Sequence, residues 1–285
     1  MIYCKELNKE FESKAEMFKA LRNSHKDIIA DKTAKIYNSD CNNEKNTIKA
    51  FPLNASKIDS ETIKELDLDS DYYYIAVNTT GILDNHGDLH LAGIWNKTKK
   101  EQQGKVYLVW DHELKGGSTI VRKEHIEMLI KEMPFSVLGM PYEGNCEALI
   151  YKFHKDKVID EKAEEWLESG DEIQASVRMQ YIKMLFALNS EAKEDVEYKK
   201  NYDKYYPQIS NKDDFENDID YFWPVLEAKN KLESSLVLFG SNHVTGMIEE
   251  EKINQPSNDT DKNIEPSNDT QKENIFEYLI KNLKQ

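Results

Sequence analysis

The chain has 285 residues, of which 39% are hydrophobic and 32% are charged, and its formal net charge is -15. This length suits one substantial domain with appendages, and the modest hydrophobic share indicates that some segments lie outside the core. A negative electrostatic field repels free DNA or RNA. The charge therefore excludes nucleic acid as a direct partner and favours basic proteins or basic peptide segments.

Cysteine content and hydropathy bear on the compartment. Cys4, Cys41 and Cys146 are far apart and odd in number, so they form neither a disulfide framework nor a metal-ligand pattern. A reducing compartment is the simplest interpretation. The charged start of the chain is unlike a signal peptide, and no stretch approaches the roughly 20 apolar residues of a membrane helix. We therefore expect a soluble intracellular protein with no membrane partner, and no motif calls for a cofactor.

Residues 1–50 are predicted to be a helical extension and a connector. Between residues 5 and 30 the apolar positions recur loosely at helical spacing. These positions are Phe11, Met17, Phe18, Leu21 and Ile28. Residues 38–60 are polar and Asn-rich, which is typical of a connector.

Residues 51–250 are predicted to form the main domain, of the α+β class. Helices are expected at 124–133 and at 160–169, the second of them ending at Gly170, a suitable left-handed cap. A charged segment at 185–225 is expected to be an insertion, either with helices of its own or as a mobile loop. Aromatic and β-branched runs predict the strands, which are 71–80, 105–110, 148–153, 173–182 and 233–239.

The last 35 residues have a different composition. Residues 251–273 contain the sequence PSNDT twice, from Pro256 and from Pro266, and such polar residues predict a disordered linker. Residues 274–285 place their apolar side chains on one helical stripe. A short amphipathic helix on a tether is typical of a docking element, and packing back on its own domain is the alternative.

Three polar residues near predicted strands are candidates for acid–base chemistry. Ser176 lies at the start or middle of the 173–182 strand, and a serine hydroxyl needs a base within hydrogen-bond reach to become a nucleophile. His112 follows the apolar strand at 105–110, where a rigid strand end would hold a general base well. Glu233 opens the last strand, and an inward-facing carboxylate there needs a partner such as a histidine. Each also has an ordinary structural explanation when taken alone.

A cluster of metal-ligand residue types is formed by Asp84, His86, Asp88 and His90. In an extended strand these side chains would lie on one face and could hold a divalent cation. The asparagine and glycine between them favour a turn, which breaks that geometry. We therefore expect a polar turn and no metal site, and a metal-dependent hydrolase is kept only as a rival hypothesis.

Two segments in the first half of the main domain have recognisable patterns. The first is D-x-x-G-D-x-x-x-x-G, which runs from Asp84 to Gly93. The second is an apolar strand, Val106 to Trp110, with Asp111 and His112 directly after it.

Two further patterns follow in the second half. One is a helix, then Gly170, then Ser176 inside a strand, and the other is the E-x-S-L-V strand that runs from Glu233 to Val237. In this order, over residues 80–245, the four patterns resemble those of the prohead (capsid-maturation) serine proteases of tailed phages. The fold of that family resembles the herpesvirus assemblins.

The resemblance implies a serine endopeptidase in which His112 is the general base and Ser176 the nucleophile of an acyl-enzyme mechanism. Glu233 is the best-matching residue to orient His112, with Asp111 or His86 as alternative third members. The fold it implies is assemblin-like, a β-rich, partly closed barrel surrounded by helices.

The resemblance also implies partners. The substrates would be the major capsid protein or scaffold segments, and the chain itself, inside the immature phage head in the host bacterial cytoplasm; homo-oligomerisation is left open. Family members commonly have glycine two residues after the serine, whereas this chain has Arg178. That arginine would either block the oxyanion site or supply a cationic donor to it. The alternative hypothesis is therefore a catalytically inactive capsid assembly or scaffolding protein on the same fold.

Overall fold

The computed structural model describes residues 1–38, 68–84, 86–169, 173–215 and 218–237. All of these residues belong to one compact unit, Met1–Val244. The α-helices are α1 (Lys14–Ala34), α3 (Asn96–Gln102), α4 (Glu161–Ser169) and α5 (Val196–Tyr205). The strands are β1 (Ile2–Cys4), β2 (Lys9–Phe11), β3 (Tyr37–Asn38), β4 (Tyr72–Thr79), β5 (Asp88–His90), β6 (Tyr107–Trp110), β7 (Thr119–Val121), β8 (Glu127–Pro134), β9 (Asn145–His154), β10 (Gln174–Met184), β11 (Ala187–Leu188) and β12 (Tyr221–Val237).

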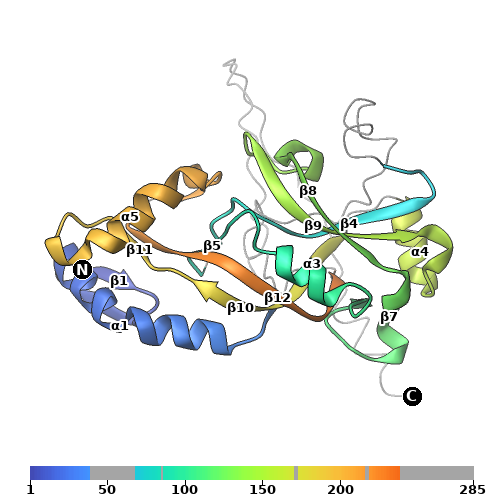
Figure 1. Cartoon of the computed structure of the whole chain (residues 1–285), viewed down its shortest axis with the longest axis horizontal. Coiled ribbons are helices and arrows are strands. Elements are labelled where there is room, and N and C mark those ends of the chain that lie inside the picture. Colours follow the sequence, from blue (N-terminus) through green and yellow to red (C-terminus); the bar gives the residue numbers. More distant parts are fainter. Residues whose placement is uncertain (39–67, 85, 170–172, 216–217, 238–285) are drawn as a thin grey trace, which may run out of the picture. The chain divides into compact units, whose positions relative to one another are not determined.

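The largest sheet is built around β12. Its main strand order is β3-β10-β12-β6-β7, and β5 and β11 also pair with β12. β10 runs antiparallel to β12, whereas β6 runs parallel to it on the other side. In Figure 1 the long β10–β12 pair connects the region of α1 and α5 with the region of β7 and α4. Among the described strands, β12 thus pairs with four, β5, β6, β10 and β11.

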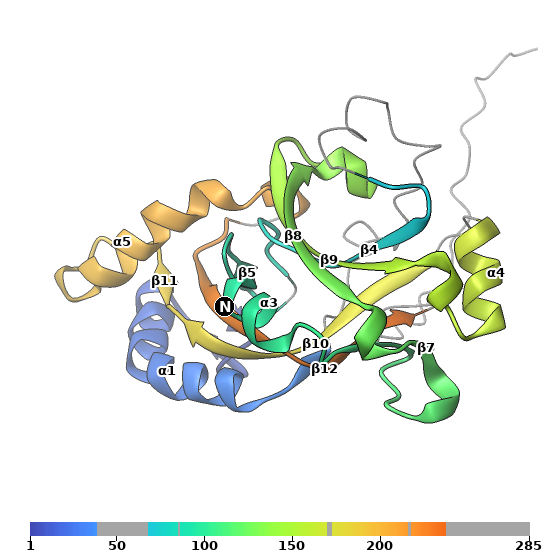
Figure 2. The same ribbon diagram turned by 45° about the vertical axis from the view of Figure 1, so that its right-hand side comes forward.

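A second sheet, of three antiparallel strands in the order β4-β9-β8, packs near β10. Its strands alternate between two apolar clusters. Ile75 and Tyr151 enter the main core, which also receives Val177 from β10, while Ala76 and Ile150 face a smaller core beside Phe135. Figures 1 and 2 both place β8 and β9 away from α1 and α5. The mixed α+β class predicted from the sequence is confirmed, but the sheets of the described residues do not close into a barrel.

The N-terminal helix α1 begins where Ser13 caps it, its hydroxyl accepting the N–H of Glu16. Met17 and Leu21 are buried in the main core, so the helix belongs to the same compact unit as the sheets. The helix expected in this part of the chain is present as α1, but it packs into the main core and is not a separate extension. The helix expected from residue 5 is wrong before Ser13, where β1 and β2 form an antiparallel hairpin.

The segment expected to be a helix at 124–133 is instead a strand. Residues Lys123–His125 form a single 3-10 turn, and β8 follows from Glu127. β8 pairs with β9 along its whole length, and Met128 and Met133 are buried on it. Tertiary pairing with a neighbouring strand has overridden the local helix propensity of this stretch.

The predicted insertion at 185–225 contains helix α5, followed by two 3-10 turns and the start of β12. Tyr202 and Tyr205 of α5 are buried in a small apolar cluster with Phe222 and Leu89, so this segment shares a core with β5 and its neighbours. Gly170, the connector at 39–60, the linker at 251–273 and the helix expected at 274–285 lie outside the described residues. No helix in the described part of the chain is long and apolar enough to span a membrane.

Candidate active site

The end of β6 holds His112 in an unusual backbone conformation. Asp111 and His112 both have positive φ, 49° and 58°, a region that costs a non-glycine residue about 1–2 kcal/mol. β12 stabilises this turn at two points. The N–H of Asp111 donates to the carbonyl of Leu236 at 3.1 Å, and the N–H of His112 donates to Ser235 Oγ at 2.8 Å. As a result, the imidazole turns back over the sheet instead of continuing along β6.

Both ring nitrogens of His112 have partners from the neighbouring strands. Nε2 lies 2.7 Å from Ser176 Oγ, and Nδ1 lies 2.9 Å from Glu233 Oε1. In the tautomer with the proton on Nδ1, the ring donates to the carboxylate and accepts from the hydroxyl. A serine, a histidine and a carboxylate are thus joined in the order that activates a serine nucleophile.

Ser176 comes from β10, on the other side of β12 from β6. It is directly opposite Ser235 in the antiparallel pair, while Ala175 and Val177 beside it enter the main core. The alternation of the strand therefore turns the Ser176 hydroxyl away from the core and toward His112. The serine is 3% exposed, so a substrate carbonyl must displace part of its surroundings to reach Oγ.

Glu233 is oriented by a bulge in β12. The register with β10 shifts between the Val177–Ser234 and Met179–Asn230 pairs, and Leu232 within the bulge has a φ of 73°. Bulges beside active sites commonly redirect a side chain. The Glu233 carboxylate is 0% exposed, and an ionised carboxylate at such a site must be hydrogen-bonded. His112 Nδ1 and the hydroxyl of Ser235 supply those bonds.

Arg178 lies two residues beyond Ser176 on the same strand and pairs with Asn38 of β3. It is half-buried, and the residues on either side of it, Val177 and Met179, enter the core. The arginine is therefore on the Ser176 face of β10.

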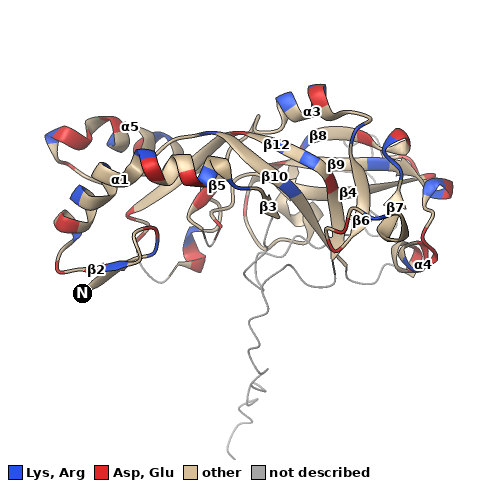
Figure 3. Cartoon of the chain, turned by 90° about the horizontal axis from the view of Figure 1, so that it is seen from below, with Lys and Arg blue, Asp and Glu red and all other residues tan. Residues whose placement is uncertain are grey.

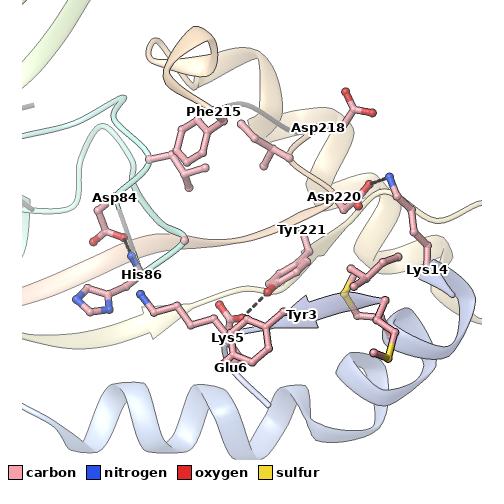
Figure 4. Close-up of a pocket in the computed structure, with 16 residues that line it drawn as sticks. Tyr3, Lys5, Glu6, Lys14, Asp84, His86, Phe215, Asp218, Asp220 and Tyr221 are labelled. Carbon is pink, nitrogen blue, oxygen red and sulfur yellow. Dashed lines mark hydrogen bonds and ion pairs between the residues drawn. The ribbon is translucent and has the colours of Figure 1, made fainter. Parts of the chain in front are cut away.

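The other candidates for the third member lie elsewhere. Asp111 is exposed, and within the described residues no hydrogen bond joins its carboxylate to His112. His86 lines a pocket of about 730 Å³ between the β1–β2 hairpin and the start of β12 (Figure 4). There Tyr221 donates to Glu6, and Lys14 pairs with Asp220 at 2.9 Å. Since Glu233 is near the other end of β12, His86 is not beside His112.

The polar turn expected in the 84–90 cluster is present at His86 and Gly87, and β5 begins directly after it at Asp88. Asp84 Oδ1 accepts the backbone N–H groups of His86 and Asp88, both at 2.8 Å. The Asp88 carboxylate pairs with Lys32 at 2.5 Å, and His90 is buried between Asn78 and Tyr181. These side chains have different partners, and no group of three or more potential metal ligands occurs in the described ranges.

Two cysteines in the described residues, Cys4 and Cys146, are buried and unpaired with each other. Burial raises the pKa of the Cys146 thiol to about 12. Because the thiolate is the nucleophilic form, this cysteine is unsuited to nucleophilic catalysis near neutral pH.

Ser235 is the site residue that sequence reasoning did not single out. It lies between β10 and β6 and contacts the backbone of His112 and the carboxylate of Glu233. The signal was its position two residues after Glu233, which places both side chains on one face of a strand. Comparison of the chain with family models, with curated proteins and with solved structures gives no match, so the assignment of this site rests on its geometry.

Proposed function

We propose that the chain is a serine endopeptidase with Ser176 as nucleophile and His112 as general base. The observation that carries the proposal is the unbroken hydrogen-bond chain from Ser176 Oγ, through both ring nitrogens of His112, to Glu233. A serine hydroxyl alone is a weak nucleophile at neutral pH, and this arrangement supplies both the base and the group that orients it.

In the proposed reaction, Ser176 Oγ attacks the carbonyl carbon of a peptide bond while its proton passes to His112 Nε2. The imidazolium is stabilised by Glu233 and gives that proton to the leaving amine, which breaks the C–N bond. Water then attacks the acyl carbon and loses a proton to His112. The ester bond to Ser176 breaks, and His112 returns the proton to Ser176 Oγ. Backbone N–H groups, with Arg178 as a cationic donor from the same face of β10, would stabilise the oxyanion.

The biological setting proposed is phage prohead maturation, with cleavage of the major capsid protein or scaffold segments and of the chain itself inside the immature head. This setting is supported by the four ordered sequence patterns and by the serine, carboxylate and histidine that adjacent strands bring together. We extend the proposal to an assemblin-like architecture built on the β10–β12–β6 arrangement. The net charge of -15 suits basic substrate segments. Figure 3 shows Asp and Glu side by side with Lys and Arg on α1, α4 and α5.

A second candidate is a catalytically inactive capsid assembly protein on the same fold. Two observations favour it: Arg178 occupies the Ser176 face of β10, and Ser176 itself is 3% exposed. A bulky cation near the oxyanion position would exclude the substrate carbonyl, whereas a correctly placed one would stabilise the transition state.

The test compares the intact mass of the wild type and Ser176→Ala over time, alone and with the cognate capsid protein. Ser190→Ala is a matched control, because Ser190 is also a buried serine but bonds Asp195 at 2.6 Å, away from the site. We expect the wild type and Ser190→Ala to cleave themselves or the capsid protein. Loss of the nucleophile should lower the rate about a million-fold.

Equal cleavage by the wild type and Ser176→Ala would remove Ser176 from the mechanism. Intact chains in all samples, with the capsid protein also uncut, would favour the assembly protein over the endopeptidase.

A further inference from the structure

Ser235 is the fourth polar residue of the site and is 0% exposed. Its hydroxyl makes two close contacts with different parts of the machinery. It accepts the backbone N–H of His112 at 2.8 Å and donates to Glu233 Oε2 at 2.9 Å. It also lies 3.2 Å from His112 Nδ1. One small side chain therefore touches the backbone of the proposed base, its ring and its carboxylate partner.

The hydrogen-bond roles at Ser235 are fixed by its neighbours. A hydroxyl has one proton and two lone pairs. The N–H of His112 can only donate and the carboxylate of Glu233 can only accept. In the tautomer with the proton on Nδ1, the Ser235 proton therefore goes to Glu233 Oε2. The proton of His112 Nδ1 then has the other carboxylate oxygen as its acceptor, at 2.9 Å. This pattern favours the tautomer in which Nε2 is free to accept the proton of Ser176.

The hydrogen bond from His112 N–H to Ser235 also affects the backbone conformation of His112. A φ of 58° is a conformation that a histidine adopts only when its surroundings hold it there. The bond from the N–H of His112 to Ser235 Oγ is one of the two that hold this turn against β12. Without it, the turn loses one of its two anchors, and the imidazole can move away from Ser176.

We propose that Ser235 is a positioning residue, which holds His112 in the rotamer and tautomer that accept the proton of Ser176. The proposal rests on the proposed protease function for its effect on rate, but its effect on His112 can be measured without any activity. The hydrogen bonds of the Ser235 hydroxyl described above go to His112 and Glu233, so the residue acts through these two side chains.

The test is a comparison of Ser235→Ala with Ser234→Ala. Ser234 is the adjacent residue, is also 0% exposed, and bonds Tyr151 at 3.0 Å instead of the site. Removing either hydroxyl deletes a buried hydrogen bond, but only Ser235→Ala removes one that reaches His112. Ser235→Cys retains the shape of the side chain with a slightly larger atom that is a weaker hydrogen-bonding group, and it serves as the second variant if Ser235→Ala does not fold.

Two readouts are required. The first has two parts: the ¹⁵N NMR spectrum of the His112 ring, which reports the tautomer, and the hydrogen-exchange rate of the His112 backbone amide, which reports the turn. We expect Ser235→Ala to shift the His112 ring toward the Nε2–H tautomer and to exchange the His112 amide roughly ten times faster, as expected for loss of one hydrogen bond. Ser234→Ala should behave like the wild type. The second is the labelling rate of Ser176 by a fluorophosphonate, which Ser235→Ala should lower roughly 10- to 100-fold, as expected for loss of a hydrogen bond to a charged group.

The outcomes separate the two proposals. An unchanged tautomer and amide in Ser235→Ala, or equal effects of Ser234→Ala on both, would overturn the positioning role whatever the activity. A changed tautomer in a chain whose wild type neither labels nor cleaves would support the positioning role and count against the protease.

Discussion

At the residue scale, the Glu233 carboxylate, held by the hydroxyl of Ser235, favours the tautomer of His112 with the proton on Nδ1. A carboxylate can only accept from Nδ1, which leaves Nε2 as the base facing Ser176. An amide at the same position could instead donate to Nδ1 and stabilise the opposite tautomer. The rate of peptide cleavage then falls because Nε2 no longer accepts the Ser176 proton, although the shape of the site is retained.

The prediction is that Glu233→Gln lowers the self-cleavage rate by about 10³- to 10⁴-fold, measured from the loss of intact mass. Glu227→Gln is the matched control, since Glu227 is on the same strand and pairs with Lys97 at 2.9 Å. We expect that variant to cleave at the wild-type rate. A Glu233→Gln chain as fast as Glu227→Gln would show that Glu233 does not orient the base.

At the element scale, helix α1 is joined to β5 by a buried ion pair. Lys32 Nζ contacts Asp88 Oδ1 at 2.5 Å and the carbonyl of His86 at 3.0 Å. Burial raises the pKa of the Asp88 carboxyl above its ordinary value, while the nearby Lys32 acts in the opposite direction. Without the lysine, the native state holds a buried carboxylate that has lost its cation.

Lys32→Met is therefore predicted to lower the free energy of unfolding by about 3 kcal/mol at pH 8.5. The effect should shrink toward pH 5. A carboxyl with a raised native pKa binds more protons in the native than in the unfolded state, so its contribution is present at acid pH and is lost as pH rises through the native pKa. Urea unfolding at both pH values measures this.

The control for that measurement is Lys35→Met, near the end of the same helix, where the lysine is largely exposed and pairs with Asp31. Exposed pairs contribute between about 0 and 1 kcal/mol. Equal destabilisation by Lys32→Met and Lys35→Met would contradict the role assigned to the buried pair. So would a destabilisation by Lys32→Met that is the same at both pH values.

Sequence reasoning succeeded at this scale where local composition and tertiary pairing agree. The strand that carries Ser176 and the strand that ends just before His112 were expected because their β-branched and aromatic residues suit a pleated core. The strand at β8 was missed because its Glu, Lys, Met and Leu residues favour a helix, and only its pairing with β9 decides the outcome. The hairpin before Ser13 was missed because its strands have three residues each, too few for a periodic signal.

At the scale of the whole molecule, the candidate site exists because β12 lies between β10 and β6. Long-range pairing brings Ser176 opposite Ser235, and it brings the end of β6 beside Leu236. The residue types were recognisable in the sequence, but the choice of Glu233 over Asp111 depends on this strand order. Ser235 could not be assigned from the sequence because its role depends on the left-handed turn at His112.

The central claim is that Ser176 is a nucleophile activated by His112. The most direct measurement is to incubate the wild type, Ser176→Ala and His112→Gln with a fluorophosphonate and to locate the adduct by peptide mass mapping. In this reaction Ser176 Oγ bonds to phosphorus, fluoride leaves, and the serine proton passes to His112. We predict one adduct, on Ser176, in the wild type and none in either variant. An adduct on another residue, or equal labelling of Ser176→Ala, would contradict the claim.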